Sequence, residues 1–175
     1  MLGEVHRLNS IVEQFLSLAR PLDIKPEAFF VQDVLHELAT LVQDEAQQSK
    51  VQIRVVAPLN LPPLKADREY LRQTLLNLIL NGLQAMPEGG TLTLEANNSK
   101  GNFLISVTDT GIGIAPENRP RIFEPYFTTK PKGSGLGLAI TRRIIEAHGG
   151  TITVFSEAGQ GCHFQIVLPI NCKEI

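Results

Sequence analysis

Tryptophan is absent from this chain, and cysteine is rare. Of its 175 residues, only Cys162 and Cys172 carry thiols, and neither has a CxxC or Cys/His spacing that would hold zinc. A chain of this length can bury an adequate apolar core without cross-links. Two cysteines therefore indicate free thiols in a reducing compartment, and neither a disulfide framework nor a cysteine-based zinc site is expected.

No excess of one charge sign is present either. Sixteen lysines and arginines stand against 18 aspartates and glutamates, and no predicted helix carries a basic stripe, so there is no electrostatic case for a nucleic-acid partner. Apolar runs stop well short of the ~20 residues that span a bilayer, and the first residues, M-L-G-E-V-H-R, lack the order of a signal peptide. We expect a cytoplasmic domain, whose full-length parent could still be anchored in the inner membrane.

The start of the chain has an amphipathic helical pattern that Pro21 ends. Five apolar residues recur at intervals of three and four: Val5, Leu8, Val12, Phe15 and Ala19. Ile11 and Leu18 widen the same face. So broad an apolar face needs a partner, which is either a helix outside this sequence or the domain that follows. The pattern predicts a helix over residues 1–20 and a linker over 21–27.

Residues 28–170 are expected to form one α+β domain, with 171–175 as a tail. Helical patterns over 34–46, 67–86 and 136–148 alternate with β-type patterns around 51–55, 92–94, 103–107, 152–154 and 164–168. Asp67 is suited to cap the second helix, a proline-rich loop precedes it, and residues 97–102 are suited to a hairpin turn. The pattern predicts a two-layer α/β sandwich, with a mixed sheet of about five strands covered by three helices.

Two asparagines interrupt the apolar helix predicted over 67–86. Asn77 and Asn81 are four residues apart, so their amides project from one face. Such a pair most often forms a satisfied hydrogen-bond network within a core. With glycine loops nearby, however, an amide oxygen is also a good ligand for Mg²⁺. Both interpretations stay open at this point.

Two glycine clusters, D-T-G-I-G-I from Asp109 and G-S-G-L-G-L up to Leu138, bracket the polar segment F-E-P-Y-F-T-T-K. Asp109 could form an ordinary Asx turn, or it could accept a hydrogen bond from an exocyclic amine and so favour adenine over guanine. The second cluster precedes an apolar helix, whose free N–H groups favour phosphate. It is neither a Walker loop nor a Rossmann fingerprint. The layout predicts a nucleotide pocket with a lid.

Taken together, these motifs resemble the catalytic, ATP-binding domain of two-component sensor histidine kinases. Residues 71–85, L-R-Q-T-L-L-N-L-I-L-N-G-L-Q-A, resemble the asparagine box of that family. D-T-G-I-G-I resembles its first glycine box, I-F-E-P-Y-F its phenylalanine box and G-S-G-L-G-L its second glycine box. The helix over 1–20 is similar to the second helix of its dimerisation hairpin. The resemblance implies the Bergerat fold, which type II topoisomerases, a heat-shock chaperone and mismatch-repair ATPases share.

The resemblance also implies roles for individual residues. Asn81 would coordinate Mg²⁺, Asn77 would help to position metal or water, and Asp109 would hold the adenine amine. Lys130 would reach the γ-phosphate from the lid, which makes Asn77 and Lys130 the expected catalytic residues. The remaining expected ATP contacts are Gly111, Gly113, Ile114, Phe127, Gly133, Ser134, Gly135, Leu136, Gly137, Leu138 and Cys162. Gln84 stands where some members place a phosphate-binding lysine.

One position separates kinase from ATPase. Hydrolytic relatives carry a glutamate where this chain has Asn77, and an amide is a far poorer base. The resemblance therefore implies a protein-histidine kinase that transfers the γ-phosphoryl group of ATP to histidine. A hydrolytic ATPase of the same fold and a non-catalytic nucleotide-binding or interaction module are the alternatives.

The histidine that should accept the phosphoryl group is not found. His36 begins H-E-L-A-T-L, which imitates the family's H-E-[IL]-[RK]-[NT]-P box but lacks the basic residue and the proline. We therefore expect a fragment that cannot autophosphorylate alone. Its partners would be the missing phosphoacceptor hairpin, a second copy in a full-length homodimer, and a cognate response regulator.

Overall fold

The computed structural model describes residues 22–131 and 133–170. The helix predicted over 1–20 and the tail over 171–175 lie outside the described residues. The elements in chain order are β1 (Glu27–Phe29), α2 (Val31–Leu41), α3 (Gln43–Gln48), β2 (Val51–Val56), β3 (Leu64–Ala66), α4 (Arg68–Gln84), β4 (Gly90–Ser99), β5 (Asn102–Asp109), η1 (Arg119–Arg121), α5 (Gly137–Ala147), β6 (Thr151–Ser156) and β7 (Cys162–Pro169).

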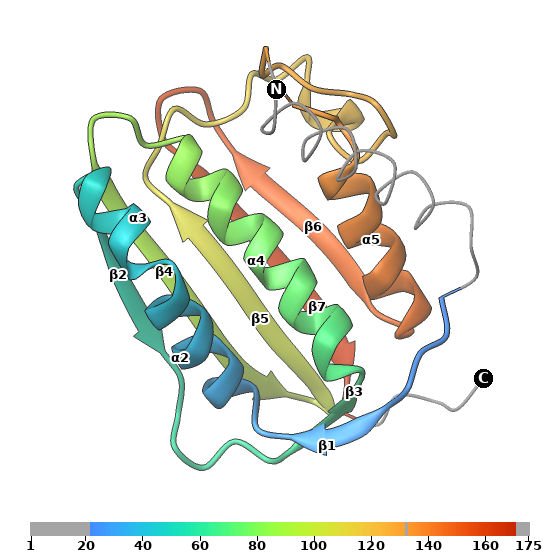
Figure 1. Ribbon diagram of the computed structural model, residues 1–175. Coiled ribbons are helices and arrows are strands. Elements are labelled where there is room, and N and C mark those ends of the chain that lie inside the picture. Colours follow the sequence, from blue (N-terminus) through green and yellow to red (C-terminus); the bar gives the residue numbers. More distant parts are fainter. Residues whose placement is uncertain (1–21, 132, 171–175) are drawn as a thin grey trace, which may run out of the picture.

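Five strands form one mixed sheet in the order β2-β4-β5-β7-β6. β2 runs parallel to β4, whereas the other neighbouring strands are antiparallel. Helices α2, α3, α4 and α5 lie side by side over one face of this sheet (Figure 1). The predicted two-layer α+β sandwich with a five-stranded mixed sheet is confirmed.

A second, two-stranded sheet was not predicted from the sequence. β1 pairs antiparallel with β3, with Glu27 opposite Ala66 and Phe29 opposite Leu64. The expectation of a loop over this part of the proline-rich segment was therefore wrong at residues 64–66. Three residues after Pro62 and Pro63 are too few to show a strand period, and their pairing partner lies far away in the sequence. Burial of Leu64 and Ala66 in the core stabilises the pair.

Two local boundaries also differ from the prediction. The helix expected over 34–46 is divided into α2 and α3, because Val42 leaves the helical conformation between them. The hairpin turn expected over 97–102 narrows to Lys100 and Gly101, both with positive φ, as a two-residue turn between twisted strands requires. These differences leave the layers unchanged.

Asp67 fixes the start of α4, as its predicted capping role requires. Its Oδ1 accepts a hydrogen bond from the Tyr70 N–H at 3.1 Å, and its Oδ2 accepts one from the Lys25 N–H at 2.9 Å. The Asp67 N–H donates to His148 Nε2 at 3.0 Å, and Nδ1 of the same ring lies 2.7 Å from the Ile144 carbonyl oxygen. The beginning of α4 is thereby joined to the end of α5, and His148 has a structural role.

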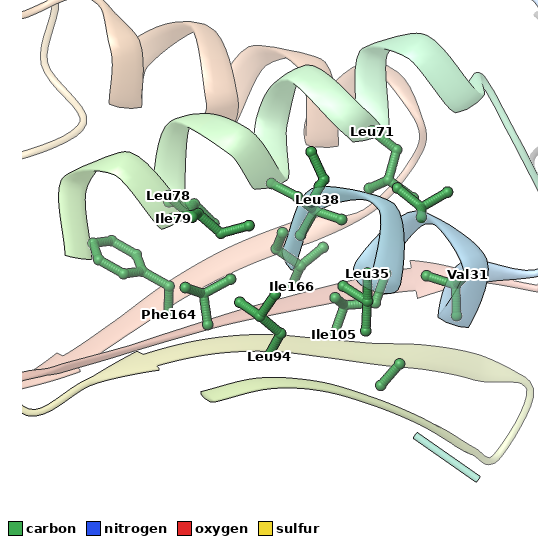
Figure 2. Close-up of a cluster of buried hydrophobic side chains, with 14 of the residues drawn as sticks. Val31, Leu35, Leu38, Leu71, Leu78, Ile79, Leu94, Ile105, Phe164 and Ile166 are labelled. Atoms are coloured by element: carbon green, nitrogen blue, oxygen red, sulfur yellow. The ribbon is translucent and has the colours of Figure 1, made fainter. Parts of the chain in front are cut away.

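The core lies between the helices and the sheet, as Figure 2 shows. Leucine, isoleucine and valine side chains of α2 and α4 point down onto side chains of β4, β5 and β7. The labelled contacts are Val31, Leu35, Leu38, Leu71, Leu78, Ile79, Leu94, Ile105, Phe164 and Ile166. Each such side chain contributes about 1.5–3 kcal/mol when fully buried. This packing fixes α4, so its polar residues project from a rigid support.

Candidate functional site

Four elements meet at the upper edge of the sheet in Figure 1, where α4 and β5 end and α5 and β7 begin. Gly82 allows α4 to lie close to the sheet, because a Cβ there would lie 2.7 Å from Leu92 Cδ1 of β4. Gly137 allows α5 to approach α4, because a Cβ there would lie 2.5 Å from Asn77 Oδ1. The structure thus brings the predicted asparagines, Asp109 and the second glycine cluster to one edge.

Asp109 is a buried carboxylate, with 4% of its surface exposed. Its Oδ1 accepts a hydrogen bond from the Gly111 N–H at 2.9 Å, which is the Asx turn that the sequence left open. Burial raises the pKa of Asp109, while the N–H groups of Gly111 and Cys162 and the Lys130 charge act against that rise. The carboxylate is positioned by backbone donors and shielded from water.

Glycines allow the backbone around Asp109 to close on itself. A Cβ at Gly113 would collide with the Glu157 carbonyl oxygen, and a Cβ at Gly161 would collide with that of Asp109. Both glycines have positive φ, 68° and 80°. Gly111 packs against the Ala85 carbonyl in the same manner. We define the backbone at Asp109, Gly111, Gly113 and Gly161 as the wall of the site. Gly161 was not predicted, because residues 157–161, E-A-G-Q-G, indicate only a turn.

Ser156 links the first glycine loop to the turn between β6 and β7. Its hydroxyl donates to the Gly161 carbonyl at 2.7 Å and accepts from the Ile114 N–H at 2.9 Å. Ser156 Oγ also lies 3.2 Å from Cys162 Sγ, and burial raises the pKa of that thiol. Ile114 and Cys162, two predicted contacts, are therefore placed beside Asp109. Ser156 was missed because one serine at a strand end carries no sequence signal.

The two asparagines of α4 lie in different surroundings. Asn77 Nδ2 donates to the buried Thr141 Oγ1 of α5 at 3.0 Å, so this amide belongs to a satisfied network between helices. Asn81 Oδ1 instead accepts from Lys130 Nζ at 2.7 Å. The network interpretation holds for Asn77, while Asn81 faces the lid. Thr141 was missed, since a threonine within an apolar helix face is not diagnostic.

The segment between the glycine clusters forms a loop whose base is closed by one hydrogen bond. The Tyr126 N–H donates to the Gly135 carbonyl at 2.9 Å, and both residues have positive φ. Within the loop, the Lys130 N–H donates to Thr128 Oγ1 at 3.1 Å. The Arg121 guanidinium lies 4.5 Å from the centre of the Phe127 ring. We define residues 119–131 and 133–136 as the lid.

Lys130 reaches from the lid to α4. Its Nζ donates to Gln84 Oε1 at 2.6 Å as well as to Asn81. Burial lowers the pKa of Lys130, and the charge of Asp109 opposes that change. The sequence predicted that Lys130 points into the site, but it gave no sign of the contact with Gln84.

The second glycine cluster leads into α5, as predicted. Leu136 is the N-cap and forms no side-chain capping hydrogen bond, although the Leu136 N–H donates to Ser134 Oγ at 3.3 Å. The first N–H groups of α5 therefore carry the positive end of the helix dipole without a capping oxygen. Leu138 packs against the main core, and Gly133 packs against Thr128 of the lid. This arrangement suits an anionic ligand.

Metal binding at this edge can be tested against the donors present. In the described ranges, 22–131 and 133–170, no three His, Cys, Asp or Glu side chains are grouped to hold an ion. Asn81 and Gln84 nevertheless present amide oxygens three residues apart, and both already accept from a cation. Neutral oxygens suit Mg²⁺, which retains several waters and takes its remaining ligands from phosphates. The residues therefore fit a magnesium ion that accompanies a phosphate ligand.

A cavity of about 540 Å³ lies at the other end of α4. Lys25, Asp67, Arg68 and Tyr70 are among its lining residues. The 17-residue helix separates this end from Gln84, so the cavity is no part of the site.

Among the described residues, no helix combines the length and apolar character that a membrane crossing requires.

Comparison with known proteins identifies the family. Residues 66–171 match the family described as histidine kinase-, DNA gyrase B-, and HSP90-like ATPase. The chain belongs to this family. Sensor histidine kinase ZraS of Escherichia coli (strain K12) is 42% identical over 171 residues, which are 98% of this chain and 37% of that protein. Sporulation kinase E of Bacillus subtilis (strain 168) is 37% identical over 97% of this chain and 23% of its own length.

Solved structures agree with these matches. Full-length ShkA in complex with AMPPNP has a TM-score of 0.87 and 34% identity, covering 96% of this chain and 37% of that chain. Histidine kinase ThkA in complex with response regulator TrrA has a TM-score of 0.84 and 26% identity, covering 99% of this chain and 50% of that chain. The chain thus spans well under half the length of the curated relatives it matches. The predicted resemblance to the ATP-binding domain of sensor histidine kinases is confirmed.

Proposed function

We propose that this chain binds ATP with Mg²⁺ and transfers the γ-phosphoryl group to a histidine on a helical hairpin outside the described residues. The observation that carries the proposal is the buried Asp109 carboxylate, positioned by backbone N–H groups inside a glycine-lined wall. A buried carboxylate has lost hydrogen bonds to water. A ligand that enters the site and donates an N–H group to this carboxylate therefore forms a favourable hydrogen bond. The complex of the related ShkA with AMPPNP supports a nucleotide as that ligand.

Asp109 selects the base in this proposal. Its carboxylate accepts a hydrogen bond from the exocyclic amine of adenine, whereas guanine presents a carbonyl oxygen at the equivalent position and is repelled. Gly111 and Gly113 allow the ring to lie against backbone, with Ile114 and Cys162 beside it. Phe127 covers the nucleotide from the lid. Base recognition is thereby assigned to the rigid end of the site.

The phosphates lie between the N-terminus of α5 and the end of α4. The N–H groups of the first turn of α5, which the N-cap residue Leu136 does not cap, donate to phosphate oxygens. Gly133, Ser134 and Gly135 lead the chain to this turn, and Lys130 approaches the γ-phosphate from the lid. Asn81 Oδ1 is the proposed ligand of Mg²⁺. When bound there, Mg²⁺ offsets the negative charge of the phosphates.

Transfer of the phosphoryl group requires a histidine acceptor. It does not require a base that activates water, as hydrolysis would. An imidazole nitrogen of the acceptor attacks the γ-phosphorus, the new N–P bond forms as the bond to the bridging oxygen breaks, and ADP leaves. Asn77 is an amide bonded to Thr141 and cannot take a proton from water, which argues against the hydrolytic alternative. The described histidines do not match the acceptor: His36 on α2 lacks the basic residue and the proline of the family's acceptor box, His148 is buried, and His163 contacts Thr108 Oγ1.

The further partners follow from this mechanism. Residues 1–20 are proposed as the second helix of the dimerisation hairpin, joined through the predicted linker 21–27 to the catalytic domain predicted at 28–170. The last residue of that linker, Glu27, is the first residue of β1. The full-length protein would act as a homodimer and pass the phosphoryl group to a response regulator. The complex of ThkA with TrrA supports the last step. We place the domain in the cytoplasm, with a parent that could be anchored in the inner membrane.

Calorimetric titration tests the pocket directly. ATP and GTP are titrated with and without Mg²⁺ into the wild-type chain, the Asp109→Asn variant and, as a matched control, Asp44→Asn on the exposed side of α3. Wild type and the control should bind ATP in preference to GTP, and Asp109→Asn should lose on the order of 100-fold in affinity, or about 2.7 kcal/mol. The proposal would be contradicted if Asp109→Asn bound ATP as tightly as wild type does, or if wild type bound GTP as tightly as ATP.

An assay with an added acceptor hairpin separates the activities. Phosphorylation of its histidine supports the kinase. Sustained release of phosphate without the hairpin would favour the hydrolytic ATPase. Binding of ATP with neither reaction would favour the non-catalytic module.

A further inference from the structure

One ammonium group is held by two amide oxygens of α4. Lys130 Nζ donates to Asn81 Oδ1 at 2.7 Å and to Gln84 Oε1 at 2.6 Å. The acceptors are three residues apart and therefore share one face of the last turn of the helix. Hydrogen bonds from an ionised donor are stronger than neutral ones. These two contacts connect the lid to the rigid part of the site.

The two acceptors are not equivalent in the proposed function. Asn81 Oδ1 is the oxygen proposed to bind Mg²⁺, and an ammonium and a divalent cation on one oxygen repel each other. Lys130 must therefore leave Asn81 when the metal and nucleotide bind. Gln84 is then the acceptor that remains to hold its ammonium.

We propose that Gln84 is a positioning residue, which holds the Lys130 ammonium at the end of α4 and directs it toward the terminal phosphate of the bound nucleotide. This inference rests on the proposed function. A neutral amide suits the task, because it orients the ammonium without neutralising its charge. A carboxylate at the same position would compete with the phosphate for that charge.

Removal of the acceptor at position 84 tests the inference. Gln84→Met keeps the length of the side chain and removes its oxygen. Because ADP lacks the terminal phosphate, we expect about five-fold weaker binding of ATP and less than about two-fold weaker binding of ADP. The matched control is Gln73→Met, the same change at another exposed position of α4. It should leave both affinities unchanged.

A double-mutant cycle shows whether Gln84 acts through Lys130. Lys130→Met should lose ATP affinity at least as strongly as Gln84→Met, and the double variant should equal Lys130→Met alone. Additive losses would overturn the inference. So would an unchanged ratio of ATP to ADP affinity in Gln84→Met.

A measurement without nucleotide separates this inference from the proposed function. Amide hydrogen exchange of Phe127 to Lys130 should be several-fold faster in Gln84→Met than in wild type and Gln73→Met, because Lys130 has lost one of the two hydrogen bonds that it donates to α4. Unchanged exchange would overturn the inference while leaving nucleotide binding intact. Failure of wild type to bind any nucleotide would overturn both proposals.

Discussion

The wall around Asp109 and the lid around Lys130 are built differently, although both are rich in glycine. In the wall, Gly113 and Gly161 bring carbonyl oxygens and chain segments into direct contact, and the polar groups are buried. In the lid, Ile122 is buried in the core and Phe123 and Phe127 pack against it, whereas the outer part is held by short-range turns, exposed side chains and the bonds of Lys130 to α4. The wall depends on backbone fit, while the outer part of the lid depends on a few charged and polar groups.

This difference indicates that the end of the site around Asp109 is part of the folded core, whereas the end around Lys130 is not. Substitutions in the wall and its support should lower the free energy of unfolding, because they disturb packed backbone. Substitutions of the exposed polar residues of the lid should change nucleotide binding while the fold keeps its stability. The following predictions test this division.

The largest effect is expected at Gly161. Its φ is 80°, and a Cβ would collide with the Asp109 carbonyl oxygen, so Gly161→Ala should lower the free energy of unfolding by about 4 kcal/mol. Gly159 in the same turn has a φ of 78° with no atom within 4 Å of an added Cβ. Gly159→Ala should therefore show only the conformational strain, about 1 kcal/mol. Urea denaturation measures both.

Equal losses in these two variants would contradict the comparison. They would mean that the turn's conformation, which both glycines share, sets the stability, and that contact with Asp109 adds nothing. A loss confined to Gly161→Ala would show that the wall is packed as tightly as a core.

The next effect concerns the support of the two helices that carry the site, at the far end where α4 begins and α5 ends. His148→Ala removes a buried ring that joins the Asp67 N–H to the Ile144 carbonyl, and it should lower the free energy of unfolding by about 3 kcal/mol. His163, which contacts Thr108 on the sheet, is only half-buried. His163→Ala should change stability by less than about 1 kcal/mol. A larger loss of stability in His163→Ala than in His148→Ala would contradict the structural role assigned to His148.

Much of this support was predictable from the sequence. The cap at Asp67, the apolar helix after it and the five main strands follow from capping chemistry and periodicity, because these are local properties. The pairing of β1 with β3 was not predictable, since three-residue strands show no period. The break at Val42 was also missed, because the apolar pattern continues across it.

The site was predictable as a set of motifs but not as a set of contacts. Asp109 and the two asparagines were found because polar residues interrupt apolar patterns. Ser156 was not found, because its importance arises from contacts with Gly161 and Ile114 that only the fold creates. The same is true of the bond between Gln84 and Lys130, 46 residues apart.

A smaller effect should appear in the pH dependence of stability. Burial raises the pKa of Asp109, so the folded protein binds its proton more readily than the unfolded chain does. Its contribution to stability is therefore present below the ordinary carboxyl pKa and is lost as pH rises through the raised pKa. Wild type should gain stability relative to Asp109→Asn as the pH falls through this range, measured by urea denaturation at each pH.

Glu37 provides the opposite sign as a control. Hydrogen bonds from Arg72 and Arg68 lower the pKa of this exposed carboxyl group on α2. Its contribution is present above the ordinary carboxyl pKa and is lost as pH falls through the lowered value. Wild type should therefore lose stability relative to Glu37→Gln as the solution becomes acidic. For each variant, the difference in the free energy of unfolding from wild type is plotted against pH. Slopes of the same sign for both variants would contradict the burial assigned to Asp109.

The smallest effect is expected in the lid. Arg121 lies over the Phe127 ring and contacts Glu124 Oε2 at 3.2 Å, but both charged side chains are more than half exposed. Arg121→Gln should therefore change the free energy of unfolding by no more than about 0.5 kcal/mol, measured by urea denaturation without nucleotide. A loss as large as that of His148→Ala would show that these exposed contacts stabilise the fold as strongly as a buried hydrogen-bonded ring does. A negligible change would mean that the outer, polar part of the lid contributes little to the stability of the fold without nucleotide, in contrast to the wall.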